Sequence, residues 1–250
     1  AKMQGKTHKC LVDLDGQPMI ERVVDTLRAT GYFERILISI ESEDPLRQLP
    51  RVAEWLDKGV IEVTPSRRNL ADSVIAVGEV VTDPLPLVIT TGDNALHKPE
   101  LVSDFVSAFD DSGADVALAF TSEEVVSPVI PDSGLAFHRL KDGGFSSCNL
   151  YGIRSHKGLE AARVFRSGGQ FGKRHWRILK SFGLLPFVLY KLKATTGARL
   201  VKRIGRNLGV NMEVVMLAYP EGPIDVDNPA SFRLTERLLQ ARREAREQAK

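Results

Sequence analysis

Apolar and polar positions follow two rhythms through the first half of the chain. One repeats apolar residues on one helical face and predicts helices over residues 18–30, 72–81 and 99–109. The other is a short run of β-branched or apolar residues and predicts strands at residues 35–40, 60–63, 85–90 and 115–120. Strand and helix in alternation are typical of an α/β protein with a mostly parallel sheet and helices on both faces.

This rhythm changes in the second half. A strand is predicted at 147–153 and a helix at 198–208. A further strand at 214–218 leads to a final helix that ends in a charged tail. We therefore expect one domain over residues 1–250, with a basic helical insertion at about 155–210.

The composition is that of a globular chain, since 43% of the 250 residues are hydrophobic and 26% are charged. This balance excludes collagen-like, disordered and coiled-coil structures for the whole chain. The longest apolar stretch, residues 182–190, contains Gly183 and Pro186 and is too short to span a bilayer. Cys10 and Cys148 lie far apart, so we expect neither a disulfide framework nor a thiolate zinc site. No leader-like segment opens the sequence, which indicates a cytoplasmic protein.

Charge is unevenly placed along the chain, although the net charge is only +2. Between Glu160 and Glu213 there is no acidic residue, and residues 161–212 hold twelve of the 34 lysines and arginines. The remainder, with 22 basic and 32 acidic residues, carries −10. This asymmetry favours an anionic partner for the basic window 161–212, and the alternative is a solvated helical face. The window lacks regular aromatic interleaving, so we expect no nucleic-acid partner.

The predicted helix at 198–208 is amphipathic. Its apolar stripe comprises Leu200, Val201, Ile204 and Leu208, and its flanking cations are Arg199, Lys202, Arg203 and Arg206. This pattern is typical of a helix resting on an anionic membrane, which would give a peripheral contact at the inner face through residues 182–208. The alternative packs the stripe on the sheet and leaves the cations in water.

Three acidic residues and one lysine are candidates for phosphate chemistry. Asp93 lies in the turn after a predicted strand, where an aspartate can hold Mg²⁺, although Asp–Asn after glycine is also ordinary turn chemistry. Asp225 and Asp227 have i, i+2 spacing on an extended segment, so their carboxylates point the same way. Asp227 or Asn228 is alternatively the N-cap of the final helix. Lys9 is either a group that neutralises phosphate charge or a surface lysine.

Four segments, taken in order, resemble elements of one enzyme family. Residues 8–22 (HKCLVDLDGQPMIER) are similar to a PKxLxxxxGxPMIxR element, and residues 69–74 (NLADSV) to a base-side segment. Residues 91–102 (TGDNALHKPELV) resemble an xGDxPLxxPExI metal loop, and residues 224–232 (IDVDNPASF) an xDIDTPEDL element. The ordered set covers nearly the whole chain. The chain thus resembles a MobA-like NTP transferase, which implies a Rossmann-like fold of the GT-A type.

The resemblance also implies an activity. Such an enzyme transfers a nucleoside monophosphate from an NTP to a phosphorylated acceptor (sugar, polyol, cofactor or lipid-linked) and releases pyrophosphate. Lys9 and Asp93 would be catalytic, Asp93 and Asp227 would hold Mg²⁺, and Asp225 would be a reserve ligand. The residues that would bind the nucleotide and the acceptor are Asn69, Ser73, Gly92, Asn149, Lys173 and Arg174.

One element of the family has no counterpart in this sequence. The N-terminal strand and its Gly-rich phosphate loop are missing, and a single glycine, Gly5, precedes Lys9. Because a sheet without its central strand would leave buried edges unpaired, we expect the loop to lie upstream of residue 1. Two other classes stay open, namely a GT-A glycosyltransferase with a nucleotide-sugar donor and a catalytically inactive homologue that binds nucleotide or membrane. Release of pyrophosphate from an NTP would distinguish the transferase from both.

Overall fold

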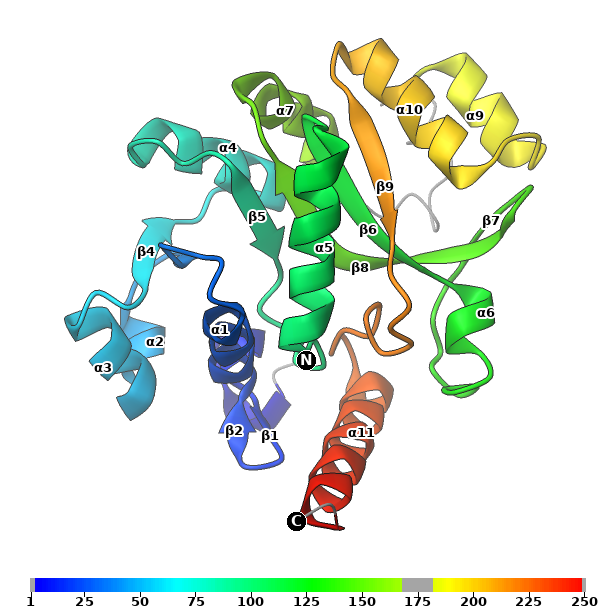
Figure 1. The fold of residues 1–250 in the computed structure, drawn as a ribbon. Helices are drawn as coiled ribbons and strands as arrows, with labels where there is room; N and C mark the ends of the chain where they lie inside the picture. The colour runs from blue at the N-terminus through cyan, green and yellow to red at the C-terminus, as the bar shows by residue number, and fades with distance from the viewer. Residues whose placement is uncertain (1–2, 168–181, 249–250) are drawn as a thin grey trace.

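The main sheet has five strands in the computed structural model, which describes residues 3–167 and 182–248 (Figure 1). The strands are β5 (Leu87–Thr90), β6 (Val116–Ser122), β7 (His138–Leu140), β8 (Gly143–Ile153) and β9 (Met212–Met216). Their order is β5–β8–β6–β9, and β7 pairs with the first residues of β8. The α/β class expected from the sequence is confirmed. Lys173 and Arg174 lie outside the described residues.

The direction of β8 requires a correction to the expected sheet. β8 runs antiparallel to both β5 and β6, whereas β6 and β9 are parallel, so the expectation of a mostly parallel sheet is only partly met. The reason is that β8 begins beside the carboxyl end of β6, where Phe145 pairs with Ser122, and no crossover first returns the chain to the amino end of β6. β5, β6 and β9 therefore share one direction, and their carboxyl ends lie at one edge of the sheet.

Two smaller sheets precede the main sheet in the chain. An antiparallel hairpin, β1 and β2, leads into the first α-helix, and a parallel pair, β3 and β4, is connected through two short helices. The bounds are η1 (Met3–Gly5), η2 (Lys9–Leu11), β1 (Asp13–Leu14), β2 (Gln17–Pro18), α1 (Met19–Thr30), β3 (Leu37–Ile40), α2 (Asp44–Arg47), α3 (Pro50–Asp57) and β4 (Glu62–Pro65). Within the described ranges β3 pairs with β4 alone, so this pair is separate from the main sheet.

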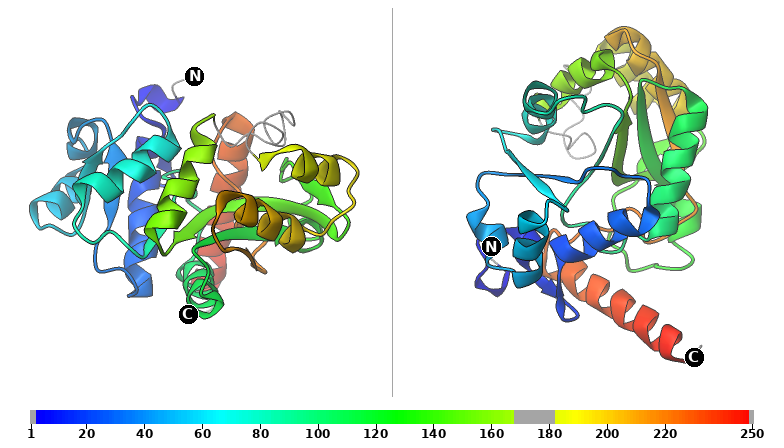
Figure 2. Two further views of the ribbon diagram at one scale, coloured as in Figure 1. Left: turned by 90° about the horizontal axis from the view of Figure 1, so that it is seen from above. Right: turned by 60° about the vertical axis from the view of Figure 1, so that its left-hand side comes forward.

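The two faces of the main sheet have different covers. Alternate residues of a strand point to opposite faces, and Ala117, Ala119 and Leu150 share a buried cluster with Phe105 and Phe109 of α5. α5 spans Pro99–Ser112. The helical segments near the other face are α4 (Leu70–Val80), α7 (His156–Ala161), η3 (Ala162–Ser167), α9 (Leu184–Lys191) and α10 (Gly197–Leu208). Figure 2 shows α5 and α7 on opposite sides of the sheet.

The apolar stripe of α10 packs on this second face. Leu200 and Ile204 are buried in a cluster with Val116 of β6 and Met212 of β9. The stripe therefore faces the sheet and not a membrane, which corrects the membrane-surface interpretation of this helix. No helix in the described part of the chain is long and apolar enough to cross a membrane.

The final helix, α11 (Pro229–Gln248), lies next to the β1–β2 hairpin (Figure 1). Arg243 of α11 forms an ion pair with Asp15 in the hairpin turn at 2.6 Å. A further short helix, α6 (Glu123–Val126), follows β6. Helices predicted from periodicity are present as α1, α4, α5 and α10, whereas the strand predicted at 214–218 occupies Met212–Met216.

Candidate active site

Three carboxylates from two loops meet at the edge of the sheet where β5, β6 and β9 end. Asp93 follows β5, and Asp225 and Asp227 follow β9. One carboxylate oxygen from each lies within 4.8 Å of the others. The carboxyl ends of parallel strands are where α/β folds place their functional sites. The three residues are called the acidic cluster below.

The two loops that carry the acidic cluster are joined by direct hydrogen bonds. The backbone N–H of Val226 donates to the carbonyl oxygen of Asp93 at 3.3 Å. His97 Nε2 lies 3.0 Å from the carbonyl oxygen of Gly222. Burial lowers the pKa of His97 to about 4, so its ring is neutral at pH 7 and donates its N–H to that carbonyl. The aspartates therefore sit on one hydrogen-bonded frame.

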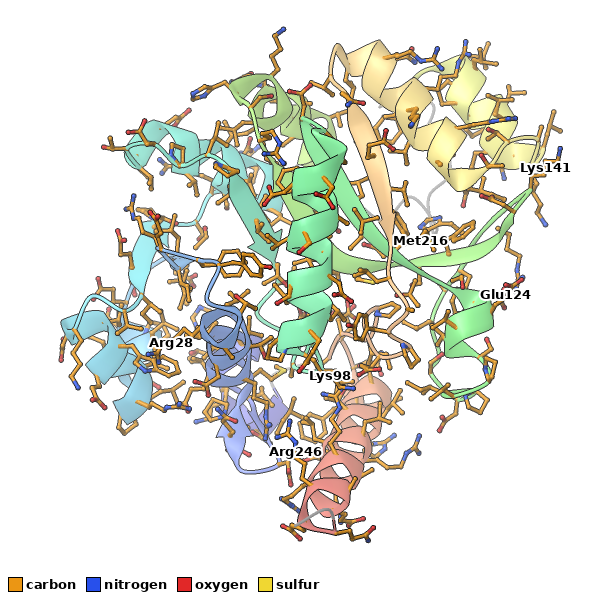
Figure 3. All side chains as sticks on the ribbon, in the orientation of Figure 1. Arg28, Lys98, Glu124, Lys141, Met216 and Arg246 are labelled. Carbon is orange, nitrogen blue, oxygen red and sulfur yellow. The ribbon has the colours of Figure 1, made fainter. Side chains whose placement is uncertain are left out.

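A buried carboxylate ties the same frame to the last helix. Glu221 accepts hydrogen bonds from Lys98 at 2.6 Å and from Arg242 of α11 at 2.7 Å. Burial opposes the negative charge of Glu221, but the two cations outweigh it and hold its pKa below the usual value. Arg242 also donates to the carbonyl oxygen of Leu96 at 2.9 Å. Figure 3 shows Lys98 at the start of α5, beside the first turns of α11.

Lys9 lies against the acidic cluster. Its ammonium forms ion pairs with Asp93 and with Asp227, the second at 2.6 Å. Burial disfavours the charge of Lys9, yet the hydrogen bonds to Asp227 and Asp93 outweigh it and raise its pKa. Gly92 permits the segment that carries Lys9 to approach the loop that carries Asp93, because a Cβ at this position would lie 3.1 Å from Cβ of Cys10. The lysine therefore balances part of the negative charge of the cluster.

Asn149 reaches the acidic cluster from an irregularity in β8. The pairing of β6 with β8 shifts register between Leu118 and Phe120, and Asn149 there has a φ of 50°, in the left-handed region. Such bulges redirect side chains next to functional sites. Asn149 Nδ2 donates to Oδ2 of Asp225 at 3.2 Å. Burial, followed by the charges of Asp227 and Asp93, raises the pKa of Asp225.

At the start of α11, the residue that caps the helix is not the residue whose carboxylate joins the acidic cluster. Asn228 Oδ1 accepts hydrogen bonds from the backbone N–H groups of Ala230 and Ser231, at 2.9 and 3.1 Å. Asn228 is therefore the N-cap, which was one of the two alternatives in the sequence. The Asp227 carboxylate contacts Lys9 instead.

Asn69 and Ser73 serve the turn into α4. Asn69 Oδ1 accepts from the N–H of Asp72 at 2.9 Å, which makes it the N-cap of this helix. Ser73 Oγ accepts from the N–H of Arg67 at 2.8 Å and donates to the carbonyl oxygen of Asn69 at 3.0 Å. Within the described ranges neither side chain bonds to the acidic cluster, so their role toward a nucleotide base stays a prediction.

The donor set of the acidic cluster fits a Mg²⁺ ion. Mg²⁺ takes hard oxygen ligands and is usually held by one or two carboxylates together with water and substrate phosphates. Asp93, Asp225 and Asp227 offer such oxygens. Sequence reasoning missed the partners His97 and Glu221, because each binds across a long chain separation that no local pattern marks. The only signal was their position in the two loops that carry the aspartates.

An acidic cluster with a lysine, at the carboxyl edge of parallel strands in an α/β fold, is the arrangement expected of a nucleotidyltransferase. Sequence comparison agrees with this class. The chain belongs to the MobA-like NTP transferase family, whose domain matches residues 1–144, more than half of the chain. This confirms the resemblance seen in the motifs and makes the protein a nucleotidyltransferase by family. No curated sequence matches the chain significantly.

Solved structures of similar fold include three informative examples. A hypothetical transferase from Thermus thermophilus is 23% identical, with 91% of each chain covered and a TM-score of 0.71. CMP:2-keto-3-deoxy-manno-octonic acid synthetase in complex with CTP is 15% identical over 95% of each chain, with a TM-score of 0.54. The 4-diphosphocytidyl-2C-methyl-D-erythritol synthase of Anaerococcus prevotii is 12% identical over 92% of this chain and 93% of its own, with a TM-score of 0.59. At these identities the likeness concerns the fold.

Proposed function

We propose that the protein transfers a nucleoside monophosphate from an NTP to a phosphorylated acceptor in a Mg²⁺-dependent reaction that releases pyrophosphate. The observation that carries the proposal is the convergence of Asp93, Asp225, Asp227 and Lys9 at one edge of the sheet. Family membership supports the reaction class.

The chemistry requires positioning and charge neutralisation. An oxygen of the acceptor phosphate attacks the α-phosphorus of the NTP, the bond from that phosphorus to the bridging oxygen breaks, and its electron pair leaves with pyrophosphate. No covalent enzyme intermediate is needed in this type of transfer. A Mg²⁺ ion held by the acidic cluster would neutralise negative charge on the phosphates.

Lys9 and Asn149 have distinct tasks in this scheme. Lys9 is a charged donor next to two of the carboxylates, from which it can turn to a phosphate oxygen of the substrate. Asn149 binds Oδ2 of Asp225 and so orients that carboxylate. Both tasks depend on side chains that the fold brings to the acidic cluster.

The test is a pyrophosphate-release assay with the full-length protein, four NTPs and a panel of phosphorylated acceptors. We expect release that requires Mg²⁺ and an acceptor and that falls at least about 100-fold in Asp93→Asn. The matched control is Asp111→Asn, which removes an exposed carboxylate on α5. Release of a nucleoside diphosphate from a nucleotide-sugar, without pyrophosphate from any NTP, would establish the glycosyltransferase alternative instead. Nucleotide binding without any turnover would indicate an inactive homologue.

A further inference from the structure

A cavity of about 440 Å³ lies between the main sheet and the helices on the face opposite α5. β6 contributes Leu118 and Phe120 to its lining, and α10 contributes Leu200 and Ile204. Side chains from α4, α7 and α9 also line it, as do residues of β8 and β9. The volume falls in the usual range for small-molecule sites.

The chemistry of the lining is mainly aliphatic and aromatic, and its polar groups already have partners. His138 Nδ1 lies 3.1 Å from the hydroxyl of Tyr190. Asp142 accepts from the N–H of Gly197 at 3.1 Å, at the start of α10. Asn69 caps α4. A sugar or polyol placed here would leave many of its hydroxyls without hydrogen-bond partners, at a cost in affinity.

The wall of the cavity is connected to the acidic cluster by two hydrogen bonds. Tyr151, which lines the cavity, donates from its hydroxyl to Oδ1 of Asn149 at 3.4 Å. Asn149 in turn donates to Asp225 at 3.2 Å. One face of β8 therefore runs from the apolar lining to the candidate metal ligands.

Two large apolar residues of the lining are exposed, namely Leu70 at 56% and Met216 at 49%. Met216 is the last residue of β9, and Figure 3 shows it at the carboxyl end of that strand. Asp225 and Asp227 follow this strand in the chain. One exposed part of the lining, at Met216, and the acidic cluster therefore lie toward the same end of the sheet.

From this juxtaposition we propose that the phosphorylated acceptor carries an aliphatic chain, which occupies the cavity while its phosphate lies at the acidic cluster. The inference rests on the proposed function and narrows its acceptor to one chemical class. An engineered apolar cavity of about 150 Å³ holds benzene, so this cavity has room for roughly three such volumes. The recognition is hydrophobic and follows chain length rather than hydroxyl pattern.

The experiment measures KM in the pyrophosphate assay for butyl, octyl and dodecyl phosphate, each below its micelle-forming concentration, and for glycerol 3-phosphate. Each buried methylene strengthens binding by about fourfold. Octyl phosphate has four methylenes more than butyl phosphate, so burial of all four lowers KM by about 200-fold. A KM that is independent of chain length, or lowest for glycerol 3-phosphate, would overturn the inference while leaving nucleotidyl transfer intact.

A cavity-filling variant locates the binding. Val214 of β9 lines the cavity, and Val214→Phe should raise KM for dodecyl phosphate at least about tenfold while leaving KM for butyl phosphate unchanged. The control is Val129→Phe, at a position that is 65% exposed and outside the lining. If the two substitutions have equal effects, the alkyl chain binds outside this cavity and the proposal is contradicted.

Calorimetric titration with the same alkyl phosphates separates this inference from the proposed function, because it requires no turnover. It also remains informative if Val214→Phe does not fold. Binding that strengthens with chain length, accompanied by pyrophosphate release, supports both. If binding strengthens with alkyl-chain length but no NTP yields pyrophosphate, the proposed function is contradicted. The bound alkyl phosphate is then not an acceptor.

Discussion

Lys9 Nζ lies 2.6 Å from Oδ1 of Asp227, although the two residues are 218 positions apart in the chain. The first candidate segment and the last are therefore joined by an ion pair. In this arrangement an ammonium occupies the side of the acidic cluster that also faces Asp93. A cation that binds these carboxylates must share them with Lys9 or displace it.

The first prediction concerns this competition. Lys9→Met should increase the affinity of the nucleotide-free protein for Mn²⁺, because two of the three carboxylates lose their ion-pair partner. It should also lower the rate of pyrophosphate release at least about 100-fold, since a charge-stabilising donor is lost. Calorimetric titration and the turnover assay give the two values. Lys58→Met removes a distant exposed ammonium and serves as control. Weaker metal binding in Lys9→Met would refute the competition.

A second prediction separates metal binding from capping at the start of α11. Asp227→Asn should reduce both turnover and its Mg²⁺ dependence, with little change in the free energy of unfolding. Asn228→Ala should lose about 1 kcal/mol of stability, the usual cost of a missing N-cap, and keep its Mg²⁺ dependence. Urea unfolding and Mg²⁺ titration of both variants give the comparison. The assignment is wrong if the two effects are exchanged.

A third prediction tests Asn149 as a positioning residue for Asp225. Asn149→Gly keeps the backbone freedom that a φ of 50° requires, but it removes the amide that binds Asp225. We expect metal affinity to fall about 10- to 100-fold, as is typical when a partner of a ligating group is lost. The melting temperature should change little. Unaltered metal affinity in this variant would show that Asp225 needs no such support.

A fourth prediction follows from the buried neutral ring of His97. Below pH 6.5 the unfolded chain binds a proton that the folded protein does not accept until about pH 4, so stability falls as pH decreases through this window. At pH 5 the loss is about 2 kcal/mol. His97→Gln should therefore show a flatter dependence of the unfolding free energy between pH 7 and pH 5. His156→Gln, at an exposed histidine, should keep the parental slope.

Local patterns were sufficient for the longer described helices, α1, α4, α5, α10 and α11. Apolar residues at helical spacing marked α1 and α5, and Gly31 marked the end of α1, whereas α5 extends to Ser112, three residues beyond the prediction. The direction of β8 was not visible, because an apolar strand reads the same whichever way it pairs. It is defined by long-range pairing, because β8 starts where β6 ends and runs back along it.

The candidate site was visible as residue types in a family order, but not as contacts. Lys9 and Asp227 could be named from their motifs, whereas their ion pair depends on how the whole chain folds. The apolar stripe of α10 could likewise be seen in the sequence, but the surface that it contacts could not. An amphipathic helix presents one apolar face whether a sheet or a lipid surface covers it, and the structure shows the sheet.

Successive side chains of β8 point to opposite faces of the sheet, so substitutions at even and odd positions should have different effects. Cys148 and Leu150, of even number, are buried in the cluster with α5, and a Cβ on Gly152 would lie 2.7 Å from the ring of Phe109. The odd-numbered neighbours, Asn149 and Tyr151 among them, face the cavity and the acidic cluster. If every residue of this strand is substituted in turn, substitutions at even-numbered positions should reduce protein abundance. Substitutions at odd-numbered positions should change which acceptors are used and the rate of transfer.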